Sequence, residues 1–180
     1  MIVFGDKNLG PVIAEVLLWK YGRDPELIYF KDQSFDDDYI IAFNDYPLRK
    51  KCVYLQKGDP FTVISYTAYK SQSAKIGKGC YIAANSTIST NVQIGDHCII
   101  NLNASIGHDA IIKDHCVILP GARISGNVII EEGTTVGANA FIDSGLHIGR
   151  ENMIDALAYV RRDLGPGRFS SGYDKSIKRL

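Results

Sequence analysis

Aliphatic residues recur at every sixth position from residue 76 to residue 159. The residues at these positions are Ile76, Ile82, Ile88, Ile94, Ile100, Ile106, Ile112, Ile118, Ile124, Ile130, Val136, Ile142, Ile148 and Ile154. The run contains (159 − 76 + 1)/6 = 14 hexads, and none slips out of register. A period of six over this length predicts a parallel β-helix, in which each hexad is one short strand and a turn.

The spacing follows from the shape of such a coil. Three hexads close one triangular coil, so residue i stacks on residue i+18 at the strand separation of about 4.8 Å. Fourteen hexads make 14/3, or about 4.7, coils. A mostly small residue comes four places after each aliphatic one, as at Cys80, Ala104 and Ala122, because the corner leaves little room. The stack must be continuous, since a single coil cannot bury its own apolar face.

Residues 1–60 follow a different pattern. Short apolar runs at 2–4, 27–30, 39–43 and 52–55 predict four strands, and residues 11–21 and 45–51 predict two helices. Asn8 can cap the first helix and Gly22 can end it. This order predicts a small α/β domain with a parallel sheet. We therefore expect three parts: an α/β domain over 1–60, the β-helix over 61–160, and a loop and basic tail over 161–180.

Composition excludes several classes of protein. The 180 residues include 20 basic and 20 acidic ones, and this balance argues against broad nucleic-acid binding. Charged residues interrupt every long apolar run, so no membrane span is expected, and the first residues lack the pattern of a signal peptide. Cys80, Cys98 and Cys116 are 18 residues apart and are predicted to be reduced packing residues in one column. These features favour the cytoplasm.

One histidine departs from the repeat in a way that suggests chemistry. His97 and His115 hold equivalent positions one coil apart and are expected on the surface, as is His147. His108, in contrast, lies near a corner and precedes Asp109, a carboxylate that could fix its tautomer and stabilise the imidazolium. Gly126 follows His108 in its column and should leave an open slot beside the ring. The pattern predicts a catalytic histidine at 108.

Two segments around His108 carry a family resemblance. Residues 101–109 (NLNASIGHD) and 120–128 (PGARISGNV) resemble the sugar acetyltransferases of the bacillosamine, perosamine and viosamine pathways and the related sialic-acid O-acetyltransferases. The resemblance implies a left-handed β-helix, preceded by a Rossmann-like α/β domain that holds a nucleotide-linked sugar. It also implies that acetyl-CoA binds between neighbouring subunits of a homotrimer, and no metal is expected.

The resemblance assigns roles residue by residue. His108 matches the general base, and Asp109 matches its acidic companion. The backbone N–H of Gly126 matches the donor that meets the thioester carbonyl. The predicted substrate-binding residues are Gly5, Asn8, Asp32, Asn44 and Asn101, and the predicted acetyl-CoA-binding residues are Gly121, Gly126, Ser144 and Ala156.

Two segments depart from the family. Leu9 stands where the first loop of the family has a histidine that touches the substrate, which affects the sugar that could bind. Residues 171–174 (SGYD) replace a Gly-x-Pro-Ala segment beside the CoA adenine.

The predicted reaction is acetyl transfer to the amino group of a nucleotide-linked sugar, such as a 4-amino-4,6-dideoxyhexose. Three alternatives stay open. The acceptor could be a hydroxyl, as in the sialic-acid branch. His97, His108 and His115 could bind zinc in a hydratase of the γ-carbonic anhydrase kind. The chain could also be a non-catalytic scaffold.

Overall fold

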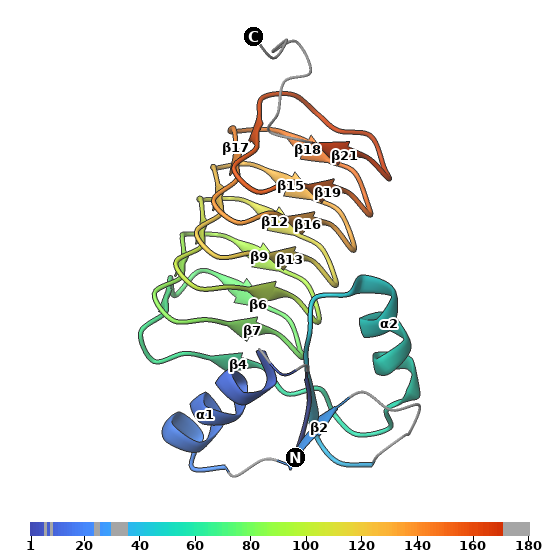
Figure 1. The fold of residues 1–180 in the computed structure, drawn as a ribbon. Helices are drawn as coiled ribbons and strands as arrows, with labels where there is room; N and C mark the ends of the chain where they lie inside the picture. Colours follow the sequence, from blue (N-terminus) through green and yellow to red (C-terminus); the bar gives the residue numbers. More distant parts are fainter. Residues whose placement is uncertain (6, 8, 24–25, 30–35, 171–180) are drawn as a thin grey trace, which may run out of the picture.

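The computed structural model describes residues 1–5, 7, 9–23, 26–29 and 36–170. Residues 63–170 wind into a parallel β-helix, and the N-terminal helices and strands pack against its first coils (Figure 1). The expected β-helix is therefore confirmed, and the small helical and strand elements before it lie at one end of the stack.

The solenoid strands of the described residues fall into three parallel sheets, one on each side of the coil. The seven-stranded sheet contains β4 (Val63–Ile64), β7 (Tyr81–Ile82), β10 (Ile99–Ile100), β13 (Val117–Ile118), β16 (Thr135–Val136), β19 (Met153–Ile154) and β21 (Phe169–Ser170). The six-stranded sheet contains β5 (Tyr69–Lys70), β8 (Thr87–Ile88), β11 (Ser105–Ile106), β14 (Arg123–Ile124), β17 (Phe141–Ile142) and β20 (Tyr159–Val160). The five-stranded sheet contains β6 (Lys75–Ile76), β9 (Gln93–Ile94), β12 (Ile111–Ile112), β15 (Ile129–Ile130) and β18 (His147–Ile148).

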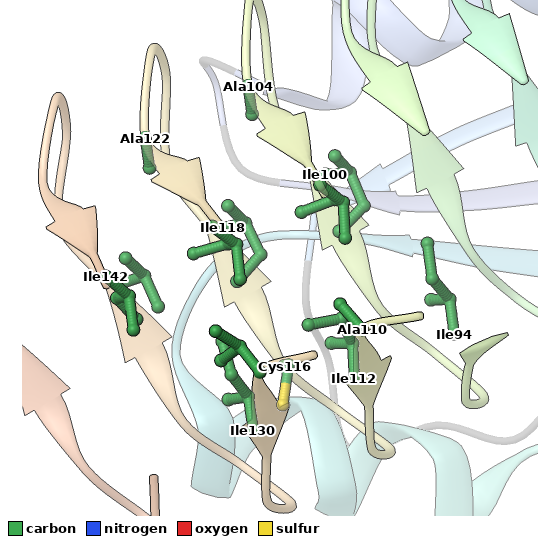
Figure 2. Packing of buried hydrophobic residues seen from close by; sticks show 14 of the residues in the cluster. Ile94, Ile100, Ala104, Ala110, Ile112, Cys116, Ile118, Ala122, Ile130 and Ile142 are labelled. Atoms are coloured by element: carbon green, nitrogen blue, oxygen red, sulfur yellow. The ribbon is translucent and has the colours of Figure 1, made fainter. Parts of the chain in front are cut away.

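The register between coils is the one that the hexads predict. Ile82, Ile100 and Ile118 pair in successive coils, 18 residues apart. The side chains of Ile100 and Ile118 point inward and stack in a column, with Ala104 and Ala122 at the corners (Figure 2). The predicted cysteine column is also confirmed, since Cys80, Cys98 and Cys116 are buried free thiols. Burial raises the pKa of the Cys80 and Cys98 thiols, so these two side chains stay neutral and act as packing groups.

The turns between strands form three edges that run along the solenoid. The His108 edge joins the six-stranded to the five-stranded sheet, and the His97 edge joins the five-stranded to the seven-stranded sheet. The third edge joins the seven-stranded to the six-stranded sheet. Many turns place a non-glycine residue at a φ near +57°, including His97 at +56° and Asp109 at +59°. Asn, Asp and His tolerate this conformation better than most residues.

The solenoid continues beyond the last hexad. We expected a loop over residues 161–167, but Leu164 bridges Ile148, and Phe169 pairs with Met153. The separation between paired residues here is 169 − 153 = 16, not 18. A coil that is two residues shorter breaks the period of six, which is why the hexad pattern misses it.

The N-terminal elements form a small three-stranded parallel sheet with two helices. The strands β1 (Ile2–Gly5), β2 (Glu26–Tyr29) and β3 (Tyr39–Ala42) lie in the order β2-β1-β3. Helix α1 (Leu9–Tyr21) ends as predicted at Gly22, which has a φ of +60°. The N–H groups of Gly22 and Arg23 donate to the carbonyls of Leu18 and Leu17, so the glycine closes the helix end.

The predicted fourth strand, residues 52–55, is wrong. Helix α2 (Tyr46–Leu55) continues through this segment. The Asp45 side chain caps the helix by accepting a hydrogen bond from the Leu48 N–H at 2.8 Å. Helical spacing buries Arg49 and Cys52 on one face and leaves Tyr54 88% exposed. A buried β-strand would have offered no place for that tyrosine, so tertiary packing decides against the local β-propensity.

The N-terminal elements dock on the outer face of the seven-stranded sheet. Ile13 and Leu17 of α1 are fully buried against the outward side chains of its first strands, which are Val63, Tyr81, Ile99 and Val117. Because this contact is apolar and continuous, it fixes the position of β3 and α2 relative to the coils. None of the helices in the described residues has the length and apolar character that crossing a membrane requires.

Candidate active site

His108 and Asp109 occupy one turn of the His108 edge, between β11 and β12. The His108 Nδ1 atom lies 2.8 Å from Asp109 Oδ2, so Nδ1–H donates to the carboxylate and Nε2 keeps its lone pair. Both side chains are about half exposed. The contact predicted from the sequence is therefore present, although the residues are neighbours in the chain. The left-handed φ of Asp109 turns its side chain toward the ring.

A third side chain holds the carboxylate from the preceding coil. The Asn91 side-chain N–H donates to Asp109 Oδ1 at 3.0 Å. The hydrogen bonds from His108 and Asn91 hold the pKa of Asp109 below its usual range, so the carboxylate stays charged. The sequence analysis missed Asn91. The signal that could have found it is the period itself, because Asn91 lies 18 residues before Asp109.

The imidazole leans over Gly126 in the next coil. A Cβ atom added to Gly126 would lie 2.6 Å from His108 Nε2 and 2.7 Å from its Cε1. The slot that we expected beside the ring is therefore filled by the ring itself, and the substrate must approach from outside it. Gly107 packs equally tightly, since its added Cβ would lie 2.6 Å from the Gly126 nitrogen. Both glycines are required by close packing between the coils.

The N–H of Gly126 is a free donor next to the imidazole. The equivalent N–H one coil later, at Ser144, donates to Asp143 Oδ1 at 2.9 Å. In the part of the chain that the structure describes, the Gly126 N–H has no hydrogen-bond acceptor. A backbone N–H without an acceptor can bind an oxygen that gains negative charge. The His108 edge therefore places an imidazole with a free Nε2 lone pair next to the glycine whose N–H has no acceptor among the described residues.

The other residues predicted to bind acetyl-CoA fall on two edges. Ser144 lies on the His108 edge, one coil after Gly126. Gly121 and Ala156 lie on the third edge, in the turns after β13 and β19. Asn101, a predicted substrate residue, also follows a strand at the third edge, where its side chain accepts the Leu102 N–H at 2.8 Å. One chain alone therefore does not bring these residues next to His108.

The predicted nucleotide-sugar residues belong to the N-terminal elements. Gly5 ends β1, and an added Cβ would lie 2.5 Å from the Gly10 Cα, so close packing alone requires a glycine there. Asn44 lines an open groove of about 770 Å³ between α2 and the seven-stranded sheet, together with Tyr46, Tyr54 and Met153. Asn8, Asp32 and residues 171–174 lie outside the described residues. The groove and His108 are on different sides of the coil.

His97 and His115 are not surface residues, as we had expected. They are 7% and 9% exposed, and their rings stack at 5.2 Å beneath α2 and β3. Tyr39 stacks on His97 at 6.2 Å, and Tyr46 meets His115 edge-on at 6.0 Å. Burial lowers the pKa of both imidazoles, and that of His97 falls to about 4 with help from the charges of His115 and Arg49. Sequence periodicity could not reveal the elements that cover this edge.

Arg49 of α2 joins this cluster, and no carboxylate within the described residues pairs with it. Its side chain is fully buried and donates to the backbone carbonyls of Phe43, at 2.9 Å, and His97. Burial lowers the pKa of the guanidinium to about 10. Arg49 Nε and the Nδ1 atoms of His97 and His115 have no partner among the described residues. The cluster therefore holds α2 against the solenoid. Because the guanidinium is a buried positive charge, the neutral form of the two imidazoles is favoured beside it.

The zinc alternative fits this arrangement poorly. His108 lies on one edge, and His97 and His115 are stacked on another. Stacked rings share a column instead of converging on one point, as ligands of a tetrahedral ion must. Within the described residues, no group of three or more His, Cys, Asp or Glu side chains could hold a metal ion.

Comparison with known families identifies the repeat. The family described as bacterial transferase hexapeptide (six repeats) matches three overlapping segments, residues 73–108, 91–126 and 109–144. The matched segments together span residues 73–144, so the likeness to this family covers the repeat and 72 of the 180 residues of the chain. The three matches are offset by 18 residues, which is one coil, so this transferase repeat and the observed register agree. Among curated proteins, none matches the chain.

Solved structures share the fold of nearly the whole chain. The acetyltransferase domain of PglB from Neisseria gonorrhoeae is 23% identical with a TM-score of 0.84, and the match covers 95% of each chain. A variant of GDP-perosamine N-acetyl transferase from Caulobacter crescentus, in complex with CoA and GDP-perosamine, is 21% identical with a TM-score of 0.82 and covers 95% of this chain and 93% of that one. WeeI from Acinetobacter baumannii is 19% identical with a TM-score of 0.83, over 94% and 95% of the two chains. At these identities the likeness is one of fold, and it includes the N-terminal elements.

Proposed function

We propose that this protein transfers the acetyl group of acetyl-CoA to the amino group of a nucleotide-linked amino sugar, such as a 4-amino-4,6-dideoxyhexose. The observation that carries the proposal is the pairing of the His108–Asp109 dyad with the free N–H of Gly126 on one edge of a transferase solenoid. The similar PglB domain has been solved with acetyl coenzyme A, and the similar perosamine enzyme with CoA and GDP-perosamine.

The reaction needs a base, an oxyanion donor and no covalent enzyme intermediate. The amine nitrogen attacks the thioester carbon while His108 Nε2 takes a proton from that nitrogen. The carbonyl oxygen gains charge and is stabilised by the Gly126 N–H, an interaction typically worth about 3 kcal/mol. The carbon–sulfur bond then breaks, and the leaving thiolate takes the proton from the His108 imidazolium. The products are an N-acetyl sugar and free CoA thiol, and the histidine is neutral again.

Asp109 supports both protonation states of the ring. In the resting state it accepts the Nδ1–H at 2.8 Å and so leaves Nε2 as the basic atom. After proton transfer it faces an imidazolium, which the carboxylate stabilises. The proposal therefore assigns the base to Nε2, the atom that lies over Gly126.

The family resemblance also suggests where the two substrates bind. We propose that the solenoid is left-handed and that a homotrimer forms, so that acetyl-CoA lies along the His108 edge with Gly126 and Ser144, while a neighbouring chain contributes residues such as Gly121 and Ala156. The N-terminal elements would hold the nucleotide-linked sugar through Gly5, Asn8, Asp32 and Asn44, with Asn101 near the sugar. The separation of Asn44 and Asn101 from His108 within one chain favours a site between subunits.

A sugar hydroxyl is the second candidate acceptor. The same dyad and N–H can serve an oxygen nucleophile, and a hydroxyl needs base catalysis more than an amine does. The scaffold alternative has less support, because a non-catalytic solenoid has no need for a charged dyad beside a free N–H.

The release of CoA thiol from acetyl-CoA tests the proposal. The purified protein is incubated with UDP-, dTDP- and GDP-linked 4-amino sugars and with their hydroxy analogues, and the thiol is followed with a chromogenic reagent. Turnover on an amino sugar, lost in His108→Ala, is the expected result. Turnover on hydroxy sugars alone would move the assignment to O-acetylation. Failure of acetyl-CoA to bind would overturn the enzyme assignment.

A further inference from the structure

Asn91 reaches from one coil to the carboxylate of the next. Its side-chain N–H donates to Asp109 Oδ1 at 3.0 Å, while Asp109 Oδ2 accepts the His108 Nδ1–H at 2.8 Å. The two oxygens of one carboxylate are thus both occupied, and its plane is fixed by two donors. A carboxylate held by one donor alone could rotate and release the imidazole.

Backbone geometry alone does not explain this contact. Asparagine occupies left-handed turn positions at Asn85, Asn91, Asn103, Asn127 and Asn139, with φ between +54° and +59°. Each of these residues suits its turn, because asparagine tolerates this conformation. Among these five turns, only the Asn91 side chain donates a hydrogen bond within the described residues. The side-chain amide of Asn91 therefore makes a hydrogen bond that the left-handed turn itself does not require.

The coil before Asn91 holds it in turn. The Asn91 backbone N–H donates to Ser73 Oγ at 2.9 Å, and Ser73 Oγ lies 3.1 Å from Ser71 Oγ. A chain of polar contacts thus runs along the His108 edge from the serines through Asn91 to Asp109 and the imidazole. Each link is anchored by a coil whose position the core fixes.

We infer that Asn91 is a positioning residue, which holds the Asp109 carboxylate so that His108 stays in the tautomer with its proton on Nδ1. The inference rests on the proposed function for its effect on rate, but its effect on the tautomer does not depend on any substrate. Asn91 acts through Asp109, so it should change kcat and leave the KM of both substrates within about twofold.

Two variants separate the side chain from the turn. Asn91→Gly removes the amide and keeps the left-handed backbone, which glycine adopts without strain. Asn91→Asp keeps the shape and the backbone preference and replaces the donor by a second carboxylate. Both should lower kcat, by on the order of tenfold for the glycine variant, as expected when one hydrogen bond to a charged group is lost. Asn85→Gly, at a turn with a φ of +56° on the third edge, is the matched control and should not change kcat.

The tautomer of His108 provides the second measurement. Nitrogen-15 NMR of labelled histidine distinguishes Nδ1–H from Nε2–H, and we expect the Nδ1–H fraction to fall in both Asn91 variants and to stay unchanged in Asn85→Gly. If the wild type transfers acetyl groups and the Asn91 variants match it in kcat and tautomer, the inference is wrong. If the wild type transfers no acetyl group, the proposed function fails, while an altered tautomer would still support the role of Asn91.

Discussion

Two edges of the same solenoid use histidine in opposite ways. On the His108 edge the imidazole is half exposed, has a carboxylate on Nδ1 and lies beside a free backbone N–H. On the His97 edge two imidazoles are buried, lack a carboxylate on their rings and stack beneath α2. The residue type and the scaffold are the same, so the difference comes from what covers each edge.

The elements that cover each edge determine whether its imidazoles stay neutral or can exchange a proton with solvent. The His97 edge is sealed by α2 and by the buried cation of Arg49, and both favour neutral rings. No helix of the described residues covers the His108 edge, and the His108 side chain is half exposed, so a proton can arrive and leave. A repeating scaffold can therefore carry a buried, stacked histidine and an exposed, carboxylate-bound histidine a few residues apart, provided that another element covers only one of them.

Replacing one histidine from each edge, in separate variants, should give the largest difference in turnover and in melting temperature. His108→Ala should lower turnover by about 10² to 10⁴, the usual contribution of a general base, with the melting temperature unchanged because the ring is half exposed. His115→Asn, which tolerates the φ of +59°, should lower the melting temperature and keep turnover within about threefold. Thiol release and thermal unfolding, measured on both variants, check the pair. If the His115→Asn variant were stable but inactive, the roles that we assign to the two edges would have to be reversed.

Removal of the buried Arg49 cation should have the next largest effect, and this effect is on the stability of the fold. Arg49→Ala removes the hydrogen bonds that the guanidinium donates to the backbone carbonyls of Phe43 and His97 and opens a cavity under α2, so we expect a loss of about 3 kcal/mol in the free energy of unfolding. Urea denaturation, followed by far-UV circular dichroism, measures it. Tyr54→Lys on α2, where the side chain is 88% exposed, is the control and should change the free energy by less than about 0.5 kcal/mol. Equal effects of the two variants would show that Arg49 does not fasten the helix.

The sequence predicts the solenoid well because the residues of its core recur at every sixth position. The aliphatic column from Ile76, the cysteine column and the pairing of His108 with Asp109 all depend on contacts within a coil or between stacked coils. Asn91 lies in the same column as Asp109 and obeys the same rule. Such features can be read from spacing alone.

The features that the sequence does not reveal depend on docking. Residues 52–55 have a β-like composition, but the buried face of α2 makes them helical. His97 and His115 have turn positions like those of exposed asparagines, and only the arrival of α2 and β3 buries them. The last coil is shorter by two residues, so its pairing through Leu164 has no counterpart in the hexad pattern.

The buried imidazoles should make stability depend on pH. The pKa of His97 falls from about 6.5 in the unfolded chain to about 4 in the fold, so between these values the unfolded chain binds more protons. Stability is therefore full above pH 6.5 and decreases as the pH falls toward 4, by about 2 kcal/mol at pH 4.5. Asp96 and Asp114 lie near the ring and oppose this shift in part.

Urea denaturation between pH 7.5 and 4.5 measures this slope. His97→Asn keeps the left-handed turn and removes one titrating group, so the curve should become shallower, while His115, whose pKa burial also lowers, retains the rest of the slope. His147→Asn removes an exposed imidazole that pairs with Glu131 and should leave the slope of the wild type. A slope that His147→Asn removes and His97→Asn retains would contradict our view of which histidines are buried neutral.

The smallest effect should come from the hydroxyl of Tyr46, which separates packing from polar contacts on the His97 edge. The hydroxyl donates to Glu132 Oε1 at 3.0 Å and accepts from Lys50 Nζ at 3.2 Å, while the ring rests on Gly133 and His115. Tyr46→Phe keeps the ring, and Lys50 still pairs with Glu132 at 2.9 Å, so we expect a loss of less than about 1 kcal/mol.

Tyr46→Ala is the comparison for this last variant, because it also removes the ring. It should cost about 2 to 3 kcal/mol in the same denaturation measurement, since the ring fills the space over Gly133. If the phenylalanine variant lost as much as the alanine variant, the polar contacts with Lys50 and Glu132 would hold α2 in place. The stacked rings would then be incidental, and the His97 edge would depend on charge as the His108 edge does.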